Sequence, residues 1–390
     1  MRAMNAFTLS LSILVATLGA TAADAAQFLV RAGDDWSTLK PKLKPGDEII
    51  LMPGKHRSVR FEDLAGEEGK PIVIRSPDEK AISTIFATEI GIHLVRCKYI
   101  RVDHVAISGG KRAGIVVAGD GDGRSSHIVL DSVYVTKTGD EGEQCGVRIE
   151  RVDHMTMKDC RIEAWHRAGV HIHGSTDVAL NGVQFVASPA TADEYAAVVD
   201  GASASVMFQR CRFGAGIGTS IALGPTGTGA LPSTSTGPDG SEPKEKPVLV
   251  DGVTVERCLS KRNGTFISFG SCSGALVRAN TIIDAGCAYS VAEPPKSFAQ
   301  VRSATFLANL IAWSPGAMKS FCKVNPGADP SGLVLETNLW YSAELPLAKP
   351  ILGEFLGTIK AEQLITVDPN LDGYDRPREE KAQGFGWTSA

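Results

Sequence analysis

Short runs with apolar residues at alternate positions recur along this chain, and many come in pairs separated by a bend of two small or polar residues. Between Gly146 and Phe213 an alternating apolar run, a bend and a further apolar stretch occur three times in similar form. The three examples are Met155–Ile162, Val178–Phe185 and Val206–Phe213. Alternation with a period of two is typical of β-strands that bury one face. The pattern therefore predicts pairs of half-buried strands joined by tight bends.

The bends are regularly spaced. The residues that follow them are Val105, Val133, Cys160, Val183, Cys211, Cys258, Asn280, Asn309 and Asn338. Successive members of this series are separated by 22 to 29 residues, except for the 47 residues between Cys211 and Cys258. A repeat of this length indicates a solenoid, and an apolar period of two rather than 3.6 excludes stacked helix pairs. The sequence therefore predicts a β-solenoid.

Equivalent residues of successive coils stack into columns in such a fold, about 4.8 Å apart. In the column after the bends, Asn280, Asn309 and Asn338 can bond each other and the backbone through their amides. This column resembles the asparagine ladder of right-handed parallel β-helices, and Cys160 and Cys211 are small enough for the same corner. The predicted fold class is all-β, a single-stranded right-handed parallel β-helix of about ten coils.

Composition and charge narrow the possible partners. The chain is 43% hydrophobic but only 6% aromatic, which suits a narrow core of aliphatic stacks. Its net charge is −4, so it has no excess of positive charge for binding phosphate groups, and we expect no nucleic acid as a partner. The eight cysteines form neither a compact disulfide framework nor a metal pattern. Cys272 and Cys287 are a candidate pair, whereas free buried thiols are expected in the bend column.

The N-terminus predicts export. Residues 1–26 contain Arg2, an apolar run from Ala6 to Ala20 and the small-residue pattern at Ala23–Ala25, which together are typical of a secretory signal peptide. A membrane anchor is the alternative, but the apolar run is short and is interrupted by Thr and Ser. We expect a secreted or periplasmic protein with no membrane span after signal cleavage.

Residues 27–96 are predicted to form an N-terminal cap and the first strands. They contain a short amphipathic helix candidate at Asp35–Leu43, followed by Leu43–Gly54 and Lys70–Arg75. This succession resembles the N-terminal cap of secreted right-handed β-helix proteins of the chondroitinase B and alginate lyase type. A short capping helix at this position would cover the open strand edges of the first coil.

The β-helix itself is expected at residues 97–345, with a flexible Gly/Pro/Ser-rich loop inserted at 225–247, and residues 346–390 are expected to form a C-terminal cover and tail. From Leu43 to about Asp372 the chain resembles secreted bacterial right-handed β-helix proteins of the pectate-lyase-like kind. The runs Ala308–Trp313 and Thr337–Tyr341 belong to this resemblance. These motifs are specific for the fold rather than for an activity.

The resemblance also raises the question of calcium. In the lyase relatives a coil supplies an Asn/Glu/Glu calcium cluster, and a downstream Lys and Arg perform β-elimination. No matching cluster occurs in this sequence. The Asp120–Ser126 turn can attract calcium, but Asp/Gly tracts between strands are mostly plain loops. The sequence therefore assigns no cofactor and no metal ligand.

Three neighbouring coils place titratable side chains at matching positions of their first strands. These strands are Gly146–Glu150, Gly169–His173 and Ala196–Asp200. If alternate residues point inward, the outward polar residues are Arg148, Glu150, His171, His173 and Asp200. Stacking then puts His171 beside Arg148, and it puts His173 between Glu150 and Asp200. We predict a flat catalytic patch made of these five residues, with a histidine as the acid or base and Arg148 neutralising a substrate carboxylate.

The turn before the second strand carries three further candidates. Trp165, His166 and Arg167 are predicted to line the same groove and bind substrate, with Trp165 as a stacking surface for a sugar. The alternative is purely structural. Outward positions of a solvated sheet hold polar residues, and opposite charges on neighbouring strands stabilise the sheet modestly.

Two functions from different classes follow. The leading hypothesis is an exported, monomeric β-helix protein that binds a polysaccharide along its exposed parallel sheet and cleaves it as a lyase or glycoside hydrolase. The alternative is a non-catalytic cell-envelope or adhesion scaffold. The patch of His, Arg and carboxylate side chains favours the enzyme, whereas the missing lyase cluster favours the scaffold.

Overall fold

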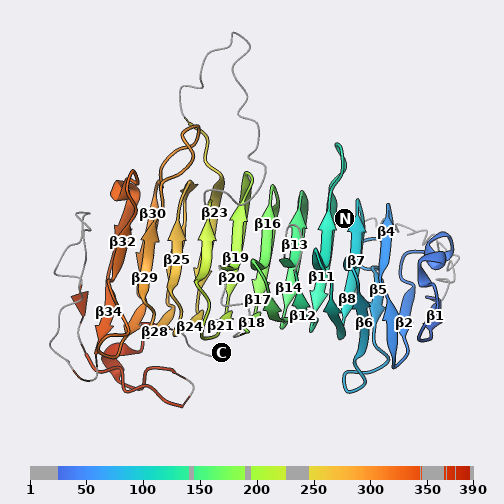
Figure 1. Ribbon diagram of the computed structural model, residues 1–390, viewed down its shortest axis with the longest axis horizontal. Helices are drawn as coiled ribbons and strands as arrows, with labels where there is room; N and C mark the ends of the chain where they lie inside the picture. The colour runs from blue at the N-terminus through green and yellow to red at the C-terminus, as the bar shows by residue number, and fades with distance from the viewer. Residues whose placement is uncertain are drawn as a thin grey trace, which may run out of the picture.

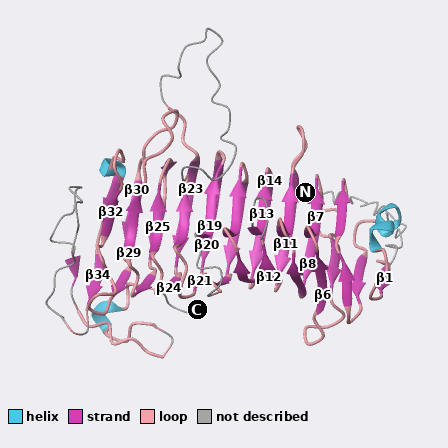
Figure 2. Cartoon of the chain, viewed as in Figure 1, coloured by secondary structure: helices cyan, strands magenta, loops and turns pink. Residues whose placement is uncertain are grey.

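The computed structural model describes residues 25–139, 145–188, 195–224, 246–342, 344, 364–365, 367–373 and 375–386. Over these residues the chain forms three long parallel sheets and a few short 3-10 helices (Figures 1 and 2). The helices are η1 (Trp36–Lys42), η3 (Pro330–Gly332) and η5 (Glu380–Ala382).

Each sheet runs the length of the molecule. In the described part of the chain, sheet A contains β1 (Gln27–Val30), β2 (Glu48–Leu51), β5 (Ile72–Arg75), β8 (Lys98–Asp103), β11 (Ser125–Asp131), β14 (Val152–Lys158), β17 (Thr176–Asn181), β20 (Ser203–Gln209), β23 (Val250–Glu256), β26 (Cys272–Ser273), β27 (Leu276–Arg278), β30 (Ala304–Leu307) and β33 (Leu333–Leu335). Sheet B contains β3 (Lys55–Arg57), β6 (Ser83–Ala87), β9 (Val105–Gly109), β12 (Tyr134–Thr138), β15 (Arg161–Trp165), β18 (Gln184–Val186), β21 (Arg212–Phe213), β24 (Leu259–Lys261), β28 (Thr281–Ile283), β31 (Leu310–Ala312), β34 (Asn338–Tyr341) and β35 (Leu364–Ile365). Sheet C contains β4 (Val59–Glu62), β7 (Ile90–Val95), β10 (Ala113–Ala118), β13 (Cys145–Glu150), β16 (Ala168–His173), β19 (Tyr195–Asp200), β22 (Thr219–Leu223), β25 (Thr265–Phe269), β29 (Cys287–Val291) and β32 (Cys322–Val324).

The chain passes from sheet A to sheet B to sheet C and then returns to sheet A. The strands β2, β3 and β4 form the first such coil, and β30, β31 and β32 form the last one with all three strands described. Every strand pairs in parallel with its equivalents in adjacent coils, as Figure 1 shows. Connections between parallel strands are right-handed as a rule, so this is a right-handed parallel β-helix. The coils begin before residue 97, because β2 to β7 already belong to the three sheets.

The core lies between the three sheets. Alternate residues of each strand point inward, and the equivalent side chains of Ile149, Ile172 and Val199 in sheet C are completely buried. Toward the C-terminal end the core contains packed aromatic rings, such as Tyr289 and Phe321, whose centroids lie 4.9 Å apart. Burial of apolar area on this scale is the main stabilising term of the fold.

The bend residues form the predicted column between sheets A and B. Lys158 pairs with Asn181, and Arg161 pairs with Gln184. Cys160 and Val183 lie between these two pairs, so one is stacked above the other. Farther along, the Asn280 amide donates to Asn309 Oδ1 at 2.9 Å, and the Asn309 amide donates to Asn338 Oδ1 at 3.0 Å. The three amides are buried and also donate to backbone carbonyls. The asparagine ladder predicted from the sequence is therefore present.

All eight cysteines are free and buried. Cys272 and Cys287, the candidate pair, do not form a disulfide. Burial raises the pKa of the Cys272 thiol to about 12, and it raises the pKa of the Cys160 thiol to about 12 as well. The cysteines are thus small apolar core residues rather than covalent links.

The N-terminal helix is η1, a 3-10 helix that begins after the N-cap residue Asp35. Its Trp36 is buried, packs edge-on against Phe61 of β4 at 5.8 Å between ring centroids, and donates from Nε1 to the carbonyl of Arg57. Figure 2 shows η1 beside β1 at the end of the solenoid. Trp36 therefore anchors this helix on the first coil.

The C-terminal segment lies on a face of the solenoid. Leu371 and Phe385 pack with Ala382 against Leu310 and Leu339 of sheet B. This segment therefore covers part of the outer face of sheet B.

The predicted signal peptide up to residue 24 and the inserted segment at 225–245 lie outside the described residues. Among the residues that are described, no helix is long and apolar enough to cross a membrane.

Candidate functional site

The register of sheet C brings the predicted patch together. Arg148 pairs with His171, and Glu150 pairs with His173, between β13 and β16. His173 pairs in turn with Asp200 of β19. Val147, Val170 and Ala197 lie in the core, and from these residues to the strand ends inward and outward residues alternate. The patch side chains therefore share the outer face of the sheet. The stacking order is the one that the sequence predicts.

Asp200 lies between the two imidazoles. His171 Nε2 is 3.1 Å from each carboxylate oxygen of Asp200, and His173 Nδ1 is 2.7 Å from Asp200 Oδ1. An ionised carboxylate only accepts hydrogen bonds, so the facing nitrogen of each ring carries a proton. In the neutral rings this leaves the lone pair of His173 on Nε2 and that of His171 on Nδ1. One carboxylate therefore orients both histidines.

The patch is largely buried, which corrects the prediction of a flat, exposed surface. His171 is 7% exposed and Asp200 is 4% exposed, whereas the side chain of His173 is 21% exposed. The small apolar side chains of Cys145, Ala168, Val198 and Ala222 pack together on the outer face of the same sheet. Of the three residues His171, His173 and Asp200, His173 consequently has the most access to solvent.

Two serine side chains, those of Ser175 and Ser203, bind the backbone at the ends of β16 and β19. Ser175 Oγ donates to the carbonyl of His173 at 2.9 Å and accepts from the backbone N–H of Val152 at 3.1 Å. Ser203 Oγ donates to the carbonyl of Asp200 and accepts from the N–H of Ser175. These two serines fix the strand ends that carry His173 and Asp200. Sequence reasoning missed them, although Ser175 and Ser203 recur at similar places after two stacked strands.

Gly201 makes room for the His173 ring. It has a φ of +68°, and a Cβ at this position would lie 2.3 Å from His173 Nδ1. We expect Gly201→Ala to displace the ring and break its hydrogen bond to Asp200. Gly69→Ala is the matched control, because Gly69 has a φ of +73° and open space at its Cβ. Both changes carry the strain of about 1 kcal/mol for a left-handed residue.

The free energy of unfolding, measured with denaturant, should therefore fall by at least about 1 kcal/mol more for Gly201→Ala than for Gly69→Ala. The nitrogen NMR signals of His173 should change only in Gly201→Ala. Equal losses of stability with unchanged imidazole signals would contradict this role of Gly201.

Arg148 and Glu150 form an ion pair within β13. Arg148 donates to Glu150 Oε2 from Nε at 3.0 Å and from Nη2 at 2.9 Å. The Arg148 side chain is 15% exposed and that of Glu150 is 32% exposed. This partial burial strengthens their attraction relative to a surface pair. A guanidinium next to His171 is a suitable partner for an anionic group.

Two of the three turn residues, Trp165 and His166, do not join the patch as predicted. Trp165 is 1% exposed and packs edge-on against Phe185 in the core, with 6.1 Å between the ring centroids, so it offers no surface to a sugar. The preceding residue, Ala164, has a φ of +52°, which shifts the alternation by one residue and turns Trp165 inward. His166 is exposed and borders a separate hollow of about 550 Å³. Arg167 is half-buried, and its carbonyl accepts from the N–H of Tyr195.

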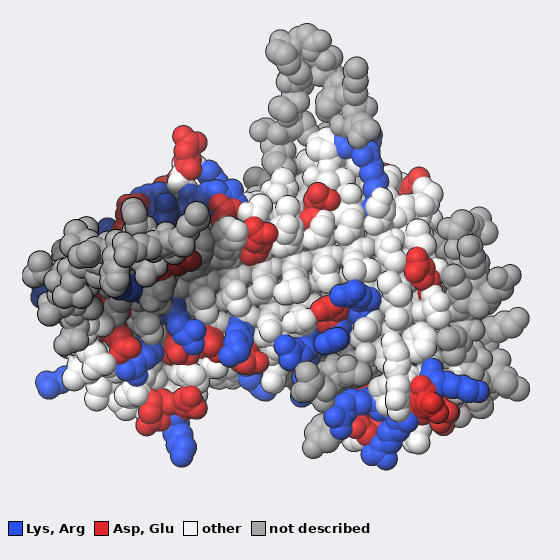
Figure 3. All heavy atoms as spheres, turned by 180° about the vertical axis from the view of Figure 1, so that it is seen from behind, with Lys and Arg blue, Asp and Glu red and all other residues white. Residues whose placement is uncertain are grey.

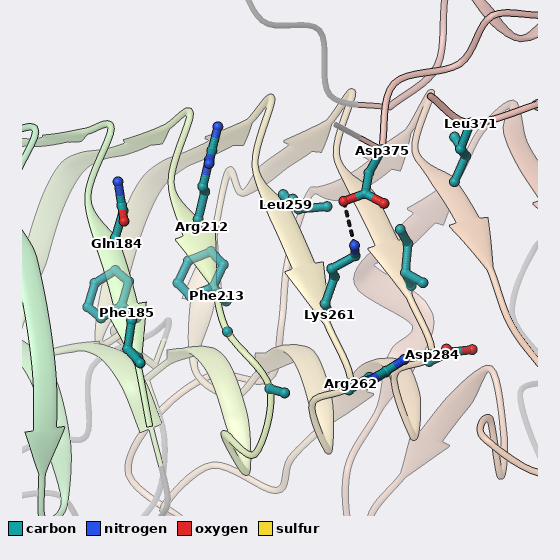
Figure 4. A pocket seen from close by; sticks show the side chains of 14 residues that line it. Gln184, Phe185, Arg212, Phe213, Leu259, Lys261, Arg262, Asp284, Leu371 and Asp375 are labelled. Carbon is teal, nitrogen blue, oxygen red and sulfur yellow. Dashed lines mark ion pairs between the residues drawn. The ribbon is translucent and has the colours of Figure 1, made fainter. Parts of the chain in front are cut away.

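A different hollow lies between sheet B and the C-terminal segment (Figure 4). It has a volume of about 480 Å³. Lys261 of β24 reaches Asp375 of the C-terminal segment, with 2.5 Å between Nζ and Oδ2. Gln184 and Arg212 lie on neighbouring strands of the same face. The residues that line this hollow include no histidine and no cysteine, so it offers less chemistry than the cluster on sheet C.

The surface charge agrees with the sequence. Figure 3 shows that, on the face opposite to the view of Figure 1, positive and negative side chains are interspersed and large areas carry neither. No broad positive field is visible among the described residues of this face.

Comparison with known proteins supports the fold. No family model matches the chain, and no curated protein matches it in sequence. An alginate lyase from Paenibacillus sp. str. FPU-7 has a similar structure, with a TM-score of 0.50 and 13% identity over 80% of this chain and 99% of that one. A rhamnogalacturonan lyase is also similar, with a TM-score of 0.51 and 10% identity over 93% of this chain and 99% of that one. The chain thus shares the right-handed parallel β-helix fold with these two proteins.

Proposed function

We propose that this protein is exported, binds an acidic polysaccharide at the outer face of sheet C, and cleaves it with His173 as the group that moves the proton. The observation that carries the proposal is the arrangement of His171 and His173 around the buried carboxylate of Asp200. A ring held on one side by a carboxylate has a fixed orientation and a defined tautomer, and both are needed for general acid–base catalysis.

The chemistry that suits this arrangement is β-elimination. Nε2 of His173 accepts the proton next to the carboxylate of a uronate unit, the electron pair forms a carbon–carbon double bond, and the glycosidic oxygen departs with a proton from solvent or from the protein. Asp200 stabilises the imidazolium that forms. Arg148 supplies positive charge beside His171, where the uronate carboxylate competes with Glu150 for the guanidinium.

Two further observations favour a polysaccharide partner. The similar structures are named as an alginate lyase and a rhamnogalacturonan lyase, so the same fold serves proteins that act on such chains. A long parallel sheet also offers equivalent positions at a regular spacing along its axis, which suits an extended polymer. Export fits this partner, and it rests on the signal-like pattern of residues 1–26.

The test is a screen of uronate-containing and neutral polysaccharides with the purified protein. Ultraviolet absorption reports the unsaturated product of β-elimination, a reducing-sugar assay reports hydrolysis, and glycan binding is measured in parallel. We expect unsaturated product from at least one uronate-containing polymer. Binding without turnover would support the non-catalytic envelope or adhesion scaffold instead. The absence of both binding and turnover would reject the proposal.

A further inference from the structure

The same three side chains form a chelating group. One ring nitrogen of His171, one of His173 and a carboxylate oxygen of Asp200 all lie within 4.8 Å of one another. Within the described residues, no other set of three or more His, Cys, Asp or Glu side chains meets this condition. The sequence did not indicate a metal site, because the third ligand, Asp200, comes from the next coil and has no fixed sequence spacing from the two histidines.

The spacing of the ligand atoms suits a small divalent ion. Zinc binds imidazole nitrogen and carboxylate oxygen at about 2.0–2.2 Å, which puts neighbouring ligand atoms of a tetrahedral site about 3.3 Å apart. In the protein the corresponding separations are 3.1 Å from His171 Nε2 and 2.7 Å from His173 Nδ1 to Asp200. These two separations are close to the tetrahedral value, and all three ligand atoms lie within 4.8 Å of one another.

The ligands are also held in place before any ion arrives. His171 and His173 belong to one strand whose inward residues, Val170 and Ile172, are completely buried in the core. His171 and Asp200 are more than nine-tenths buried themselves. Ser175 and Ser203 tie the strand ends. Little conformational freedom remains to be lost on binding, which favours affinity.

We propose that His171, His173 and Asp200 bind one divalent first-row transition-metal ion, such as Zn²⁺. Two imidazoles and one carboxylate are a donor set for such ions, whereas Ca²⁺ and Mg²⁺ prefer oxygen ligands alone. Three protein ligands leave coordination positions open for water or another small ligand. The inference concerns only what the three side chains bind and does not require that a polysaccharide is cleaved.

Metal binding has a consequence that does rest on the proposed function. A neutral imidazole has one proton and one lone pair. If Nδ1 of His173 coordinates the ion, the proton moves to Nε2, and this nitrogen no longer accepts a proton from substrate. The metal-bound form and the proton-transferring form of His173 therefore exclude each other. Any cleavage that depends on His173 should be inhibited by Zn²⁺ and restored by a chelator.

The experiment uses tag-free protein that has been dialysed against a chelator and then freed of it. Titration with Zn²⁺ in a calorimeter, and with Co²⁺ followed by visible absorption, should give one ion per chain. His171→Ala and His173→Ala should each weaken Zn²⁺ binding by about 100-fold or more. His154→Ala on sheet A is the control and should bind normally. Ca²⁺ should produce no comparable heat.

A second readout needs no variant. Diethyl pyrocarbonate modifies accessible imidazoles, and Zn²⁺ should protect His173 from it without protecting the exposed His127 of sheet A. The absence of one-to-one binding, or binding that survives the loss of both cluster histidines, would overturn the proposal. These titrations contain no polysaccharide, and the polysaccharide screen is run on chelated protein, so each proposal can fail without the other.

Discussion

Val183→Asp should unfold the protein. Val183 is completely buried in the corner column between sheets A and B, directly above Cys160 and below Cys211. A carboxylate at this position would lose its hydration and find no partner in a column of apolar side chains. The cost of burying such a charge is several kcal/mol, which is comparable with the whole stability of a typical domain, about 5–15 kcal/mol.

The matched control is Val183→Cys. Cysteines already occupy the neighbouring corners of the column, and their Sγ atoms lie 3.4 Å from the carbonyls of Leu130 and Leu180. We expect a loss of only about 1 kcal/mol for this smaller apolar side chain. Circular dichroism and denaturant titration measure both variants. A cooperative transition of Val183→Asp at the wild-type midpoint would show that the corner is not a closed core position.

His173→Ala should lower the rate of polysaccharide cleavage by about 10² to 10⁴-fold, which is the usual cost of removing a general base. His173 is preferred over His171 because its side chain is 21% exposed, whereas that of His171 is 8% exposed, and because its short hydrogen bond to Asp200 directs Nε2 away from the carboxylate. The rate is measured on the polymer that responds in the screen, after the fold of each variant has been checked.

Two comparisons sharpen this test. Asp200→Asn should also lower the rate, because an amide can present its NH₂ group to the ring and favour the other tautomer. His154→Ala should leave the rate unchanged, because the exposed His154 belongs to sheet A and pairs with Asp177. Full activity of His173→Ala would remove the proposed role of His173, even if the polysaccharide is still cleaved.

The fold was predictable because two independent patterns determine it. The period of two decides which side chains of a strand face the core, and the spacing of the bends decides which strands stack. Together they give the register, so that the pairing of Glu150 with His173 and of His173 with Asp200 could be predicted without coordinates. The asparagine ladder was equally accessible, since Asn280, Asn309 and Asn338 recur at the same place in three coils.

The exceptions have local causes. Trp165 was expected at the surface, but the left-handed residue Ala164 inserts an extra step into the alternation and turns the ring into the core. Alternation alone carries no information about such residues.

The burial of His171 and Asp200 was missed for another reason. It depends on the packing around the outer face of sheet C, where Val198 and Ala222 lie, and a strand pattern does not reveal what packs on its outer face.

The asparagine ladder also determines the order in which the last coils of the solenoid can be completed during synthesis. Asn309 Oδ1 accepts from the backbone N–H of Asn280, and Asn338 Oδ1 accepts from that of Asn309. Each corner is thus completed by a residue that leaves the ribosome 29 residues later. During synthesis, one buried corner near the growing end therefore always lacks its partner. Folding of these coils must trail translation by one full turn, and the last amide, Asn338, is the one whose arrival completes the ladder.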